Sequence, residues 1–321
     1  MIETPISKRS ISVISSILLS FLCFVGSITA ANDAFKHEGY KAIVPFQDKF
    51  LAVGSDGRMD WISNSGTVLK SDKMPAVTFR CLAATNQTIV AAGNKGNLFI
   101  SPENGKFQKV ESGTDKTIFS LTFFNNKIVA GCEQGRLLIG DEKGIFKEKQ
   151  LELKGNIVSL SSRNSDCYGV TDAGEIIHTT DGTNWIVFNY NEFYSGFYLP
   201  CSFTKVFLTN DRITIAGSHT NGTPVLLFSS QGNVWTERTL NYTTEDNQAS
   251  YLTEIPNDIS YNLFEDLIIL VCSDGKMMTV PSCSHCNKLV PISTESLDAV
   301  AQNEKIMMIV GENYFIKAIT K

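Results

Sequence analysis

Cys283 and Cys286 form the one compact group of reactive side chains in the sequence. A Cys-x-x-Cys pair serves as a redox centre, as half of a zinc site, or as a local disulfide. A redox centre needs a helix amino terminus beside the thiols, whereas the flanking segments 277–280 and 289–292 have the apolar pattern of strands. No second Cys-x-x-Cys pair is present to complete a zinc site. The pattern therefore favours a disulfide across a hairpin turn, with free thiols next and redox catalysis last.

Other cysteines and the histidines do not suggest a metal or a cofactor. Cys167 and Cys272 stand inside apolar runs, where a free thiol behaves as a small buried hydrophobic group. The four histidines are separated by tens of residues, at positions 37, 178, 219 and 285. A metal site built from several histidines needs closer convergence than this spacing favours. We expect no metal and no cofactor.

Carboxylates are the remaining candidates for catalysis. A glycosidase needs two of them across a cleft, one as acid and one as base or nucleophile. Many acidic residues here fall in segments with turn composition, such as Asp56, Asp141, Glu142 and Asp274. No Walker-type phosphate loop occurs. The sequence therefore assigns no catalytic residue, and a binding role is favoured over an enzymatic one.

An internal repeat predicts how these residues are positioned. An apolar run, a Gly or small residue, a short turn with a second Gly, and another apolar run recur about every 40 residues. Seven copies align at Gly54, Gly93, Gly131, Thr171, Gly217, Cys272 and Gly311. Short strands at this period are typical of β-propeller blades. We therefore predict an all-β fold, a seven-bladed β-propeller of four-stranded antiparallel blades.

One copy predicts all four strands of a blade: 117–124, 127–130, 136–139 and 145–148, with Asn125 and Asn126 as the first turn. No fourth strand follows the last copy, while an extra segment, 34–37, precedes the first one. We expect this amino-terminal segment to complete the last blade and close the ring, because closure removes open sheet edges.

Two irregular connections and one long turn suggest a binding face. The connections are 189–200, rich in aromatic residues, and 241–258; the turn is 218–222 in the fifth copy. Propeller connections and the turns between second and third strands emerge on one face, so the three segments should lie together around blade 5. Aromatic loops on a rigid scaffold commonly recognise sugars, peptides or proteins. The predicted ligand-binding residues are Phe193, Tyr194, Phe197, Tyr198, His219 and Tyr251. The alternative is that these aromatics cap the interface between blades 4 and 5.

The segment Ile177 to Trp185 reads Ile-His-Thr-Thr-Asp-Gly-Thr-Asn-Trp, and weaker versions occur at 228–235 and 100–107. These segments resemble the Asp-box (BNR-like) turn of sialidase-like repeat propellers and of the photosystem II stability and assembly factor family. The resemblance implies a structural turn in which Asp181 accepts backbone N–H groups. It does not imply sialidase activity: the nearest match to the Phe/Tyr-Arg-Ile-Pro motif, 78–82, lacks the proline, and the arginines are scattered.

The amino terminus indicates export. Lys8 and Arg9 precede an apolar run over 11–25, and small residues follow at 27–31. Serines interrupt the run, so we interpret residues 1–31 as a cleaved signal peptide and 32–321 as a single propeller domain, with no transmembrane segment in the mature chain. The localisation that follows is periplasm, cell surface or extracellular space. The net charge of −5 does not favour nucleic acid. The expected partner is a glycan or an envelope or extracellular protein, and a glycoside hydrolase or polysaccharide lyase is the alternative.

Overall fold

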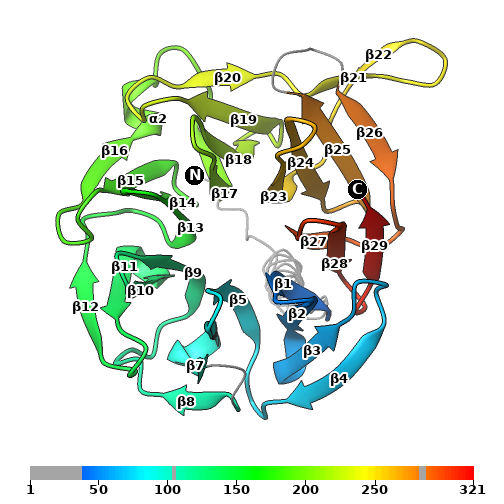
Figure 1. The fold of residues 1–321 in the computed structure, drawn as a ribbon. Helices are drawn as coiled ribbons and strands as arrows, with labels where there is room; N and C mark the ends of the chain where they lie inside the picture. The colour runs from blue at the N-terminus through cyan, green and yellow to red at the C-terminus, as the bar shows by residue number, and fades with distance from the viewer. Residues whose placement is uncertain (1–37, 103–105, 282–286) are drawn as a thin grey trace, which may run out of the picture. The chain divides into compact units, whose positions relative to one another are not determined.

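A computed structural model describes residues 38–102, 106–281 and 287–321. These residues form a seven-bladed β-propeller of antiparallel sheets around a central axis (Figure 1). Each blade is built from strands that are consecutive in sequence, running from the centre to the rim. The inner strands of neighbouring blades pack in a closed cycle, with β27 against β1. The predicted fold class is confirmed.

Blade 1 contains β1 (Tyr40–Phe46), β2 (Lys49–Gly54), β3 (Arg58–Ile62) and β4 (Val68–Lys73). Blade 2 contains β5 (Phe79–Ala84), β6 (Thr88–Gly93), β7 (Leu98–Pro102) and β8 (Gln108–Val110). Blade 3 contains β9 (Ile118–Phe124), β10 (Lys127–Cys132), β11 (Arg136–Gly140) and β12 (Phe146–Gln150). Blade 4 contains β13 (Ile157–Arg163), β14 (Asp166–Thr171), β15 (Glu175–Thr179) and β16 (Ile186–Asn189).

Blade 5 contains β17 (Cys201–Leu208), β18 (Ile213–His219), β19 (Pro224–Ser229) and β20 (Thr236–Arg238). Blade 6 contains β23 (Pro256–Asn262), β24 (Leu267–Cys272), β25 (Lys276–Pro281) and β26 (Lys288–Pro291). Blade 7 contains β27 (Leu297–Gln302), β28 (Ile306–Gly311) and β29 (Ile316–Thr320). Outside the blades lie a helical turn, α2 (Tyr190–Phe193), and a hairpin of β21 (Asn241–Thr243) and β22 (Ala249–Tyr251). Short 3-10 turns follow β2, β6 and β10: η1 (Ser55–Gly57), η2 (Asn94–Gly96) and η3 (Glu133–Gly135).

Strand composition follows position in the blade. The second strands are apolar on both faces, and every residue of β6 is buried because neighbouring blades cover both sides of the sheet. The rim strands are polar, and β4 is almost entirely exposed. In blade 3 the observed strands match the predicted ones within about two residues at each end. Asn125 and Asn126 both have positive φ, at 49° and 58°, as a two-residue hairpin turn requires.

The repeated glycines have two distinct roles. Gly57 has a φ of +69°, in the left-handed region, so the prediction that a glycine serves the turn is confirmed there. Gly54 is different, because its φ of −172° is extended backbone that any residue adopts. A Cβ on Gly54 would lie 2.0 Å from the Gly39 carbonyl oxygen, so this position excludes a side chain by close backbone approach.

The ring closure is described only in part. Gly39 forms an isolated bridge with Glu312, and the Asn313 N–H donates to the Glu38 carbonyl at 2.8 Å. These contacts connect the start of blade 1 to blade 7. The predicted fourth strand of blade 7, residues 34–37, lies outside the described residues, as do the signal peptide and the Cys283–Cys286 turn. Those predictions remain untested.

Candidate functional site

The connection between blades 4 and 5, residues 189–200, is anchored firmly at its base. Asn189 caps α2, its side-chain oxygen accepting from the Glu192 N–H at 3.1 Å. The Asn191 amide group donates to the carbonyls of Ala173 and Cys201, both at 2.9 Å, and its oxygen accepts from the Cys201 N–H at 2.7 Å. One asparagine therefore ties the connection to blade 4 and to the first residue of β17.

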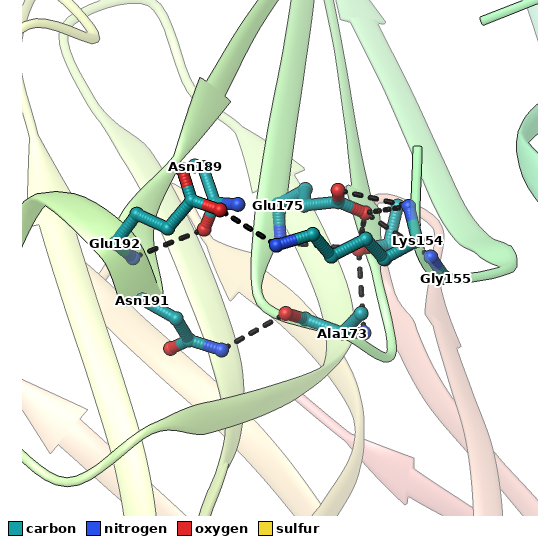
Figure 2. A network of polar contacts seen from close by, with 8 residues as sticks. Lys154, Gly155, Ala173, Glu175, Asn189, Asn191 and Glu192 are labelled. Carbon is teal, nitrogen blue, oxygen red and sulfur yellow. Dashed lines mark hydrogen bonds and ion pairs between the residues drawn. The ribbon is translucent and has the colours of Figure 1, made fainter. Parts of the chain in front are cut away.

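A buried carboxylate stabilises the adjacent turn of blade 4 (Figure 2). Glu175 is 2% exposed and accepts from the N–H groups of Lys154 and Gly155 at 2.9 to 3.2 Å. The Thr171 hydroxyl donates to the same carboxylate at 3.0 Å. The Lys154 ammonium group forms an ion pair with Glu192 of α2 at 2.6 Å, which connects the segment between β12 and β13 to α2. Several hydrogen bonds to one carboxylate make its burial tolerable.

Aromatic rings of this connection divide into packed and exposed groups. Tyr190 is buried in the core shared by blades 4 and 5, and Tyr194 packs half-buried against the same core. Phe193, Phe197 and Tyr198 are 64%, 83% and 47% exposed. The rings contact one another in series, with Tyr194 centred 4.9 Å from Phe193 and 5.8 Å from Tyr198. We call residues 190–199 the aromatic loop; its base is core and its tip is solvent-facing.

His219 lies beneath this loop rather than on the surface. It is 9% exposed, and its Nδ1 lies 3.0 Å from the Leu199 carbonyl oxygen and 3.3 Å from Cys201 Sγ. Its Nε2 lies 3.0 Å from Glu237 Oε1. The order thiol, imidazole, carboxylate is that of a nucleophile with its base. Burial, however, raises the pKa of the Cys201 thiol to about 12, so the thiol stays protonated and the cluster holds the loop to β18.

Tyr251 belongs to the second insertion. The β21–β22 hairpin extends outward beside blade 6, whereas α2 lies on the other side of blade 5 (Figure 1). The hairpin is anchored by Leu240 and Leu252, both buried between blades 5 and 6, while Tyr251 is 62% exposed. Within the described ranges, no hydrogen bond, ion pair or ring contact joins Tyr251 to the aromatic loop. The structure thus brings five of the six predicted residues together and places Tyr251 apart.

A second feature is repeated in all seven blades. Each inner strand has a β-bulge near its start, after the first residue paired with the second strand in six blades and after the third in blade 5, so one residue per blade is left without a cross-strand partner. The seven bulge residues are Lys41, Arg80, Phe119, Val158, Thr204, Asn257 and Asp298. Six of them line one opening of about 250 Å³ at the end of the central channel. We call these seven residues the bulge ring and the opening the channel mouth.

Ion pairs join neighbouring blades in and below the mouth. Lys41 pairs with Asp298 between blades 1 and 7, and Lys205 pairs with Asp258 between blades 5 and 6 at 2.8 Å. Asp258 also accepts from the Val300 N–H at 2.9 Å, which connects it to blade 7. Both channel carboxylates are therefore committed to lysines.

Sequence reasoning missed the bulge ring. The repeat contained the signal, because in six blades the bulge residue directly follows the first residue of the inner strand, as Lys41 follows Tyr40 and Arg80 follows Phe79. The residue types at this position differ from blade to blade, so a search for recurring motifs did not select it.

The Asp-box-like turn has the hydrogen bonds that its sequence suggests. Asp181 Oδ1 accepts from the N–H groups of Thr183 and Asn184, both at 2.7 Å, and Gly182 has a φ of +75°. These hydrogen bonds lower the pKa of Asp181. Trp185 packs against the core between blades 3 and 4. The turn is therefore a structural feature of the rim of blade 4.

Across residues 38–102, 106–281 and 287–321, no group of three or more His, Cys, Asp or Glu side chains is placed to hold a metal ion. No helix in the same ranges has the length and apolar character to cross a bilayer. Five cysteines there are buried free thiols, including Cys167 and Cys272 as predicted.

Comparisons with known proteins support the fold. The WD40 β-propeller domain of Doa1 superposes with a TM-score of 0.66 at 10% identity, covering 88% of this chain and 93% of that one. The computationally designed protein Ika8 gives a TM-score of 0.62 at 10% identity, covering 90% of this chain and 98% of that one. No family model and no curated protein sequence matches the chain. At these identities the similarity shows a seven-bladed propeller and carries no function.

Proposed function

We propose that this protein is an exported, non-enzymatic binding propeller that recognises a protein outside the cytoplasm through its aromatic loop. The observation that carries the proposal is that one short loop has a buried, hydrogen-bonded base and an exposed aromatic tip. Tyr190 and Asn191 fix the base, while Phe193, Phe197 and Tyr198 present large apolar surface to solvent. Exposed aromatics on a rigid base lose little conformational freedom on binding, which is typical of interface hot spots.

A protein partner fits the loop better than a glycan. Sugar sites combine an aromatic face with polar groups that hold hydroxyls. Two polar side chains of the loop are already engaged: the amide of Asn191 binds three backbone groups, and Glu192 pairs with Lys154. A loop tip whose exposed surface is mainly aromatic is suited to a pocket on another protein. Glycan binding is the second outcome that the experiment distinguishes.

Site-specific photo-crosslinking in the producing organism tests the proposal. A benzophenone amino acid replaces Phe197, and the matched control replaces Phe264, which is 78% exposed in the turn after β23. Phe264 follows the end of an inner strand, so it lies on the opposite face from the aromatic loop. We expect one discrete protein adduct from position 197 and none from position 264. Equal adducts from both positions, or glycan-array binding that depends on Phe197 without any protein adduct, would contradict the proposal.

Export is the second component of the proposal. Its support is the order of basic, apolar and small residues over 1–31. We expect the mature chain to begin between Ala30 and Asp33, which amino-terminal sequencing of the protein recovered from the envelope or medium will measure. Recovery of a chain that still begins at Met1 would refute export by a cleaved signal.

A further inference from the structure

The channel mouth has an uneven distribution of charge. Of the bulge ring, blades 1 and 2 contribute the cations Lys41 and Arg80, and blades 3 and 4 contribute the apolar side chains Phe119 and Val158. Asn257 and Asp298 complete the lining of the mouth from blades 6 and 7. The mouth therefore has a cationic side and an adjoining apolar side.

Arg80 is the cation without a carboxylate partner. Lys41 is paired with Asp298, and Lys205 below it is paired with Asp258. In the part of the chain that the structure describes, no Asp or Glu lies within ion-pair distance of Arg80. Its guanidinium group instead lies over the ring of Phe119, 5.6 Å from the ring centroid. Three cations and two carboxylates leave one positive charge here, on a protein whose net charge is −5.

We propose that the channel mouth binds a carboxylate attached to an apolar body, with Arg80 holding the carboxylate and Phe119 and Val158 contacting the apolar part. An arginine presents paired N–H donors that match a carboxylate in a bidentate manner. The cation–π contact with Phe119 orients the guanidinium group before a ligand arrives, which lowers the entropic cost of binding. A volume of about 250 Å³ accommodates a small acid or a single terminal residue of a peptide.

This site is separate from the aromatic loop, and it does not depend on the proposed partner. Both features lie at the ends where the inner strands begin, since the loop leads into β17 and the bulge follows three residues later at Thr204. A single bound molecule need not contact both. The inference therefore stands or falls by its own experiment.

Titration of the purified protein, labelled with ¹⁵N and followed by NMR, tests the site directly. The probes are 3-phenylpropionate, its neutral amide, and glucuronate, an acid with a polar body. We expect saturable binding of 3-phenylpropionate, at least about tenfold tighter than of the amide or of glucuronate. Acetyl-glycyl-phenylalanine with a free carboxylate identifies the source: binding tighter than 3-phenylpropionate indicates a peptide terminus, and weaker binding indicates a free acid. Either result supports the site.

Variants assign the binding to Arg80. Arg80→Gln should weaken 3-phenylpropionate binding at least about tenfold, and Arg80→Lys should weaken it less. The matched control is Arg163→Gln, since Arg163 ends an inner strand at the opposite face, where its Nε donates to Asn210 Oδ1 at 2.5 Å. Equal binding of acid and amide, equal binding of glucuronate, or an unchanged Kd in Arg80→Gln would overturn the proposal.

Discussion

The aromatic loop and the bulge ring lie at the same ends of the inner strands, but they arise in opposite ways. The loop is an insertion that interrupts the repeat between blades 4 and 5, and its side chains are held by contacts unique to that position. The ring uses one position present in every blade, where a bulge leaves one residue unpaired, and in six blades that residue lines the channel mouth. The insertion in the repeat therefore forms an exposed aromatic surface, whereas the repeated bulge position forms the lining of a concave opening.

The largest expected effect separates the base of the loop from its tip. Tyr190→Ala should destabilise the fold by about 3 to 5 kcal/mol, because it truncates an aromatic residue that is 1% exposed. Phe197→Ala should change stability by less than about 0.5 kcal/mol, because its ring is 83% exposed. Denaturant unfolding measures both. Similar losses in the two variants would mean that the tip is packing rather than a binding surface.

Glu175→Gln should cost about 1 to 3 kcal/mol, because an amide cannot accept the hydrogen bonds that Lys154, Gly155 and Thr171 donate to both carboxylate oxygens. Asp172→Asn is a suitable comparison, since that carboxylate also bonds the backbone, at Asn156, but lies at the exposed turn. Urea midpoints measure the difference. An unchanged midpoint in Glu175→Gln would show that the buried network does not support the loop.

The predicted closure of the propeller by the amino-terminal segment is tested by a deletion. Deleting residues 32–37 should lower the Tm by at least about 2 to 4 °C, the change expected for 1 kcal/mol in a domain of this size class. The reason is loss of the fourth strand that we predict for blade 7, whose described strands end at β29. A Tm unaffected by the deletion would disprove closure by the amino-terminal segment.

Cysteine labelling reports whether the loop opens. Burial raises the pKa of the Cys201 thiol to about 12, and the side chain is 3% exposed, so iodoacetamide at pH 8 should leave it unmodified in the native protein. Cys167, with a pKa raised to about 12 by burial in blade 4, is the matched control away from the loop. Mass spectrometry follows both sites. Faster labelling of Cys201 than of Cys167 would contradict a rigid loop base.

The smallest effect concerns pH. Hydrogen bonds from Asn184 and Thr183 lower the pKa of Asp181 below its unfolded value of about 3.9. The stability that Asp181 contributes is therefore present above that unfolded value and is lost as pH falls toward its folded pKa. Asp181→Asn should lower the Tm at pH 7 and have a smaller effect near pH 3. An equal Tm difference at both pH values would show that ionisation of Asp181 does not stabilise the turn.

Architecture was predictable because the propeller imposes the same physical demands seven times. Glycines such as Gly54 and Gly57 recur since close backbone approach and positive φ leave little choice of residue. The site was predictable only in part. The exposed aromatics were visible as an interruption of the repeat, but burial of His219 depends on its contacts with Leu199, Cys201 and Glu237, which join three segments.

The proposed role of Arg80 could not be predicted from the sequence. Its role depends on a missing carboxylate and on a ring, Phe119, that comes from the next blade. Sequence alone does not reveal which charges find partners across blades. Ion pairing in the channel is decided by tertiary neighbours, as in the pairing of Lys41 in blade 1 with Asp298 in blade 7.

The triple variant Phe193→Ala, Phe197→Ala and Tyr198→Ala tests the central claim most directly, because it removes the tip of the aromatic loop and leaves Tyr190 and Tyr194 in place. Tagged wild-type and variant proteins are exported from the producing organism, their Tm is measured, and the protein retained by each after mild crosslinking is identified. We predict a Tm change of less than about 2 °C together with loss of the partner that the wild type retains. A large fall in Tm, or retention of the same partner by the variant, would contradict a binding role for this loop.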